Sequence, residues 1–139
     1  MNWKRIWIGA LLAGFAYFLI GGVIHHVLLA GAWQTLQQSG KMLSPKPSVV
    51  IVLALQDLLI GFVLTWLYVL ARPRLGPGPK TAIVMGSIAW VLLAVPTFVF
   101  QWLWMPWPAQ IAWVELGGNL VRCWISIYLA GWQYIEKAP

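Results

Sequence analysis

Four long apolar runs, separated by three short polar or proline-rich connections, account for most of the 139 residues of this chain. A helix needs about 20 residues to cross a hydrocarbon core of about 30 Å, and each run has that length. In lipid, a helix also satisfies the backbone hydrogen bonds of a single segment. The pattern therefore predicts four transmembrane helices, at about residues 6–30, 49–71, 81–104 and 109–134.

The connections predict how these helices are arranged. The connection at 105–108 is so short that the last two helices must form an antiparallel hairpin. The connection at 31–48 is the longest, and it is too short for a separate soluble domain. We therefore expect an all-α polytopic membrane protein, with residues 1–139 forming a single antiparallel four-helix transmembrane domain.

Composition agrees with a membrane protein and indicates its orientation. Apolar residues make up 61% of the chain and charged residues 9%, whereas a soluble domain averages about 25% charged residues. The positive-inside rule places basic loops and tails in the cytoplasm. The residues assigned to that side are Lys4, Arg5, Arg72, Arg74, Lys80 and Lys137, against Lys41 and Lys46 on the other. Both termini are thus predicted to be cytoplasmic, and the net charge of +6 indicates anionic lipid as a partner and not nucleic acid.

Aromatic residues and the single cysteine add little chemistry. Most of the eleven tryptophans lie near predicted helix ends, where aromatic belts sit at headgroup level. Trp90 and Trp124 lie deeper, so they require lipid-facing or packing positions. Because Cys123 is the single cysteine, the chain cannot form an internal disulfide. Cys123 is best interpreted as a small buried apolar residue.

Ionisable residues interrupt the apolar runs, although such groups are costly inside a membrane and usually face a bundle interior. They are His25, His26, Asp57, Glu115 and Arg122. In the last helix, five polar residues share a stripe about 60° wide. These are Glu115, Asn119, Arg122, Ser126 and Gln133. The last helix is therefore predicted to turn one polar edge toward the other helices.

Each predicted helix also contributes one polar residue at a common depth, about 8–12 Å below the outer surface at 1.5 Å per residue. These residues are His25, Asp57, Thr97 and Glu115. With Asn119 and Arg122 they define a predicted buried polar layer. The first hypothesis is a structural clasp, in which these side chains hydrogen-bond one another and fix the register of the helices.

Other interpretations of the layer involve a ligand or an ion. His25 or His26 would serve as the axial ligand of a haem or a chlorophyll, a common role of imidazole. Adjacent residues point about 100° apart on a helix, so only one of the two would ligate a given cofactor. A metal ion, a proton or ion path in an oligomer, and a small apolar ligand such as a quinone or a lipid are further alternatives.

Sequence motifs of common enzymes are missing from the chain, including G-x-S-x-G, C-x-x-C, the P-loop and G-x-G-x-x-G. We therefore expect a non-enzymatic role. The leading hypothesis is a small integral membrane scaffold or accessory subunit of a larger membrane complex, or of a homo-oligomer. The alternatives are a cofactor-binding subunit of an electron-transfer or photosynthetic complex, and a small oligomeric proton-coupled transporter or channel.

Three segments carry a resemblance to known proteins. They are Met1–Arg5, the turn Arg72–Thr81 with Gly86 and Trp90 after it, and the helix end Gly131–Tyr134. In these segments the chain resembles a family of small bacterial four-helix membrane proteins of unknown function. The resemblance implies a bacterial inner membrane and a four-span fold, and it carries no functional residues.

Overall fold

The computed structural model describes residues 2–41 and 46–134. Within these residues the chain forms five α-helices and one π-helix, and no strand. The elements are α1 (Trp3–Val23), η1 (Ile24–Leu28), α2 (Ala30–Gln38), α3 (Pro47–Leu75), α4 (Pro79–Trp104) and α5 (Ala109–Gln133). The predicted all-helical fold is therefore confirmed for this part of the chain.

Three helical segments are long and apolar enough to cross a membrane. They are Trp3–Leu28, Pro47–Leu75 and Pro79–Trp104. This finding supports an integral membrane protein with at least three candidate spans among the described residues. The fourth predicted span, α5, has sufficient length but is not one of these three. Its polar edge, which includes Glu115, Asn119 and Arg122, makes it less apolar than the others.

The structure corrects several predicted helix boundaries. The first predicted helix is not continuous, because Leu29 leaves helical geometry (φ −109°, ψ 4°) and separates η1 from α2. The second extends beyond its predicted end to Leu75 and contains Pro73 in its last turn. The turn before α4 is therefore shorter than predicted. It depends on Gly76 and Gly78, whose positive φ values of 81° and 115° favour glycine.

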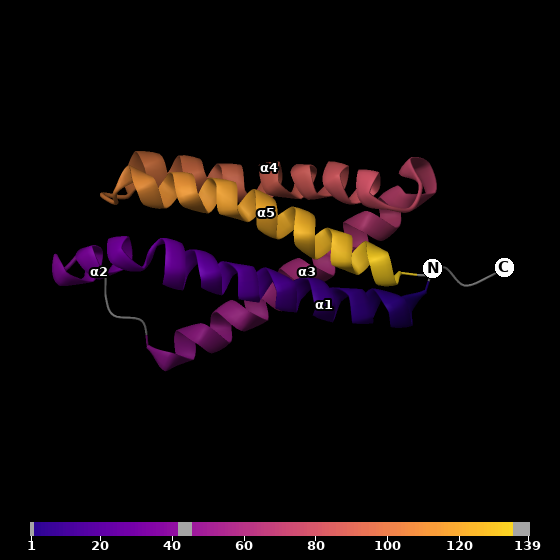
Figure 1. Cartoon of the computed structure of the whole chain (residues 1–139), viewed down its shortest axis with the longest axis horizontal. Helices are drawn as coiled ribbons and strands as arrows, with labels where there is room; N and C mark the ends of the chain where they lie inside the picture. Colours follow the sequence, from indigo (N-terminus) through magenta and orange to yellow (C-terminus); the bar gives the residue numbers. More distant parts are fainter. Residues whose placement is uncertain (1, 42–45, 135–139) are drawn as a thin grey trace.

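Two helix pairs build the molecule (Figure 1). The hairpin of α4 and α5 packs against α1, while α1 also packs along α3. The start of α1 and the end of α5 lie at the same end of the molecule (Figure 1). There, the backbone N–H of Asn2 donates to the hydroxyl of Tyr134 at 3.2 Å.

Small residues allow α1 and α3 to cross at very short range. A methyl group added at Gly61 of α3 would collide with the backbone of Ala10 and Gly14 in α1. Hydrophobicity does not drive helix association in lipid, so close van der Waals contact of this kind replaces it. The crossing places Asp57, one turn before Gly61, against the centre of the bundle.

The N-terminal half of α3 runs away from the other helices (Figure 1). Residues 47–56 are exposed apart from the half-buried Ala54. The first buried residue of this helix is Asp57. This divergence separates the part of α3 before Asp57 from its neighbours.

Candidate functional site

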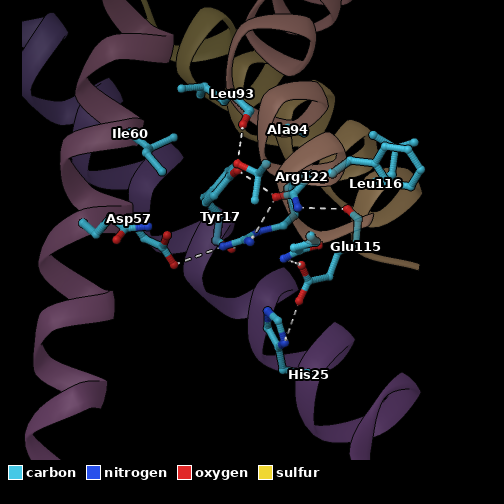
Figure 2. A pocket seen from close by; sticks show the side chains of 14 residues that line it. Tyr17, His25, Asp57, Ile60, Leu93, Ala94, Glu115, Leu116 and Arg122 are labelled. Carbon is cyan, nitrogen blue, oxygen red and sulfur yellow. Dashed lines mark hydrogen bonds and ion pairs between the residues drawn. The ribbon is translucent and has the colours of Figure 1, made fainter. Parts of the chain in front are cut away.

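A cavity of about 280 Å³ lies among α1, η1, α3, α4 and α5. Its lining includes all six residues of the predicted polar layer, His25, Asp57, Thr97, Glu115, Asn119 and Arg122. The fold thus brings polar residues from separate helices together around one space, as Figure 2 shows.

Arg122 lies at the centre of this arrangement and has a partner for each nitrogen of its guanidinium. Its Nη2 is 3.1 Å from Oδ2 of Asp57, in an ion pair whose two residues are both buried. Its Nε donates to the backbone oxygen of Tyr17 at 3.0 Å, and its Nη1 donates to Oδ1 of Asn119 at 3.2 Å. The guanidinium also lies 3.7 Å from the ring centroid of Tyr17, a cation–π contact.

Tyr17 and Asn119 close the network around this cation. The hydroxyl of Tyr17 donates to Oδ1 of Asn119 at 2.9 Å. The side-chain amide of Asn119 donates to the backbone oxygen of Glu115 at 2.8 Å. We call Tyr17, Asp57, Asn119 and Arg122 the clasp. It joins α1, α3 and α5, and it compensates a buried charge that would otherwise be very costly.

A second cluster of polar side chains lies beside the clasp, and fewer of its polar atoms have hydrogen-bond partners. Nε2 of Gln101 donates to Oε2 of Glu115 at 2.7 Å. Nδ1 of His25 is 3.8 Å from Oε1 of Glu115, an ion-pair distance that is too long for a hydrogen bond. Oε1 of Gln101 is buried and has no hydrogen-bond partner among residues 2–41 and 46–134. We call His25, Gln101 and Glu115 the open group.

The π-helix η1 contains the two adjacent histidines, and their side chains have different surroundings. The N–H of Leu29 donates to the oxygen of Ile24 at 2.9 Å, which widens the turn that contains both rings. His25 is half-buried, lines the cavity, and has its ring 5.8 Å from that of Trp33. His26 is exposed and does not line the cavity. Of the two candidate cofactor ligands, only His25 is therefore placed at the site.

The exposed part of the cavity lining lies on α3 and α4. Three of the lining residues are exposed, namely Gln56 on α3 and Leu93 and Thr97 on α4. The hydroxyl of Thr97 donates to the oxygen of Leu93 at 2.8 Å. Polar side chains are rare where a membrane helix faces lipid, so their presence here is unusual.

The size and composition of the cavity limit what it holds. Ligand pockets commonly measure about 300–1,000 Å³, so this cavity matches a small molecule or a head group more closely than a tetrapyrrole ring. Within the described residues, no group of three or more His, Cys, Asp and Glu side chains is placed to hold a metal ion.

Comparison with known proteins assigns the chain to a family. The model of the family described as "Protein of unknown function (DUF1761)" matches residues 8–129. The chain belongs to the DUF1761 family. The expected membership of an uncharacterised family is thereby confirmed. No curated protein and no solved structure is similar to the chain.

The DUF1761 domain contains both the clasp and the open group. Sequence reasoning did not assign Tyr17 and Gln101 to the layer, although each carried a signal. Tyr17 is three residues after Gly14 and four before Gly21, on the same buried face of α1. Gln101 is one helical turn after Thr97, in an otherwise apolar stretch of α4. The spacing of polar and small residues along each helix would have assigned both residues to the polar layer.

Proposed function

We propose that this DUF1761 protein is an integral membrane protein that binds a small amphipathic molecule taken from the bilayer. The observation that carries the proposal is the open group, since Glu115 and Gln101 have hydrogen-bonding capacity that the protein does not use. Leu93, Ala94 and Phe98 add apolar walls. Apolar walls with a few polar groups are typical of ligand pockets, and the exposed lining on α3 and α4 offers a lateral route for the ligand.

In this proposal α5 is a fourth span, and both termini lie at the cytoplasmic face of a bacterial inner membrane. The 25 residues of α5 exceed the length needed to cross the hydrocarbon core. Arg122, Ser126 and Gln133 are buried, while Trp113 is exposed, so the polar edge of α5 faces inward. Of the basic residues expected inside, Lys137 lies outside the described residues.

The proposal gives different roles to the clasp and to the open group. The clasp fixes the register of the helices, because its groups already use one another as partners. The open group contacts the ligand, because its acceptors remain available. Binding without catalysis is the proposed activity, since neither part presents a nucleophile paired with a base.

A matched pair of substitutions on α4 tests this function. Leu93→Trp places an indole at the cavity, whereas Leu92→Trp places one at a neighbouring position that is 65% exposed and does not line it. Benzylamine, benzyl alcohol and benzoate are each titrated calorimetrically into protein in lipid nanodiscs, with empty nanodiscs subtracted. At least one probe is expected to bind the wild type and Leu92→Trp, and to bind Leu93→Trp at least about tenfold more weakly. Equal binding by both variants, or no binding at all, would contradict the function.

A second candidate function is an accessory subunit of a larger membrane complex. The observation that favours it is the outer half of α3, which is exposed at residues 47–53 and carries the exposed Gln56 at membrane depth. A transmembrane helix of a larger subunit would satisfy Gln56 by an interhelical hydrogen bond. Mass spectrometry of the protein extracted with its surrounding native lipid would then show another chain at fixed stoichiometry. A preparation without one rejects this candidate.

The hypotheses of a haem or chlorophyll at His25 or His26 and of an oligomeric proton-coupled transporter stay predictions. His25 is the histidine that either would use, since it lines the cavity beside Glu115.

A further inference from the structure

Most hydrogen-bond donors around the cavity are already used inside the protein. The guanidinium of Arg122 is directed at Asp57, Tyr17 and Asn119. The hydroxyls and amides of the clasp and of α4 donate to protein oxygens. Two lining side chains, Gln56 and His25, carry N–H groups that form no hydrogen bond to an oxygen of the described residues. Both are more exposed than the clasp.

Acceptors, in contrast, remain available at the open group. Oε1 of Gln101 is buried without a partner in the described part of the chain. Oε1 of Glu115 has its nearest cationic candidate, His25, at 3.8 Å. An acceptor buried without a donor is unfavourable, so a ligand that donates hydrogen bonds at this point would be stabilised.

The charges of the lining residues also favour a ligand that donates hydrogen bonds, because they favour a cation. The cavity is lined by one guanidinium and two carboxylates, so its formal charge is −1 while His25 is neutral. Arg122 is paired with Asp57, which leaves Glu115 as the uncompensated carboxylate. Because the side chain of Glu115 is mostly buried, a cation beside it is favoured and an anion is repelled.

We propose that the head group bound at the open group is a protonated primary amine. This inference rests on the proposed function and specifies its ligand class. An ammonium group has three N–H donors and no acceptor, which matches the free oxygens of Glu115 and Gln101. Phe98, which lines the same cavity, supplies an aromatic ring for a cation–π contact. A hydroxyl group supplies one donor and no charge, and a carboxylate would meet Glu115 with like charge.

The test compares benzylamine, benzyl alcohol and benzoate in the same nanodisc titration. Benzylamine is expected to bind most tightly, and benzoate is expected not to bind. Glu115→Gln removes the charge with little change of shape, so it should weaken benzylamine binding by about tenfold or more. Gln101→Ala should weaken it by a smaller factor. Gln110→Ala, an exposed amide on α5 that does not line the cavity, is the matched control and should bind like the wild type.

Each outcome supports or rejects a separate part of the account. If Glu115→Gln and wild type bind benzylamine equally, the amine proposal is wrong. If benzyl alcohol or benzoate binds best, and Leu93→Trp abolishes that binding, the ligand class is wrong while the proposed function holds. If no probe binds, both are wrong. Circular dichroism checks that each variant is folded, and Gln101→Ala carries the test if Glu115→Gln does not fold.

Discussion

Arg122 is a buried cation, and an unpaired charge would be very costly at this position. It and Asp57 are 8% and 6% exposed, and their 3.1 Å contact is the ion pair that joins α5 to α3. A buried pair contributes modestly to stability as a whole, yet removal of one partner leaves the other charge uncompensated. This asymmetry distinguishes a structural clasp from a set of independent polar residues.

Arg122→Met is expected to lower the free energy of unfolding by about 3 kcal/mol, because Asp57 stays buried without its partner. The double variant Asp57→Leu with Arg122→Met should recover part of that loss, since it removes both charges. Reversible unfolding in mixed micelles, followed by tryptophan fluorescence, measures both values. If the double variant is no more stable than Arg122→Met alone, the ion pair does not act as proposed.

The polar layer was predictable at this scale because depth follows from residue count. Counting inward from the helix ends placed His25, Asp57, Thr97 and Glu115 at one level, and all four line the cavity. The partners within the layer were not predictable. They depend on the rotation of each helix and on side-chain reach, and the sequence does not show that Arg122 extends to Asp57 or that Gln101 extends to Glu115.

At the scale of elements, the crossing of α1 and α3 determines where Asp57 lies. The crossing depends on a contact between Gly14 and Gly61 that leaves no room for a side chain. It therefore fixes how far α3 is from α1, and the N-terminal half of α3 diverges from its neighbours before this point (Figure 1).

Gly61→Ala is expected to lower the free energy of unfolding by about 2 kcal/mol, because a methyl group would force two backbones apart. Gly22→Ala is the control, since a methyl group at Gly22 meets no atom within 4 Å, and its effect should stay within about 0.5 kcal/mol. The same unfolding measurement compares the two. Similar effects of both substitutions would show that the crossing tolerates a wider separation.

The periodicity of the chain predicted which segments are helical, but it could not predict where they are interrupted. The segment from Ile24 to Leu29 is continuously apolar except for the histidine pair, so nothing in its composition indicates a π-turn or the break at Leu29. At the C-terminal end of α3, the sequence pattern placed Pro73 in a loop. It lies in the last helical turn, where it removes the hydrogen bond that its own N–H would have made to the oxygen of Val69, and the helix ends two residues later at Leu75.

At the scale of the whole molecule, the proposed four-span topology makes an opposite prediction for each side of the membrane. Single cysteines replace Ser39, Lys80 and Trp132, each of which lies near a helix end. An impermeant maleimide should label position 39 in intact cells, and positions 80 and 132 only after the membrane is opened. Cys123 is fully buried and should stay unlabelled. Labelling of position 132 from outside would show that α5 does not cross.

The central claim is that the open group binds a small molecule from the bilayer, and its most direct test is to find that molecule. The wild-type protein is extracted from its native membrane in nanodiscs, and native mass spectrometry identifies what is released with it. The account predicts one amphipathic amine per chain, present with Leu92→Trp and lost with Leu93→Trp. Release of bulk lipid alone, identical for the wild type and both variants, would contradict it.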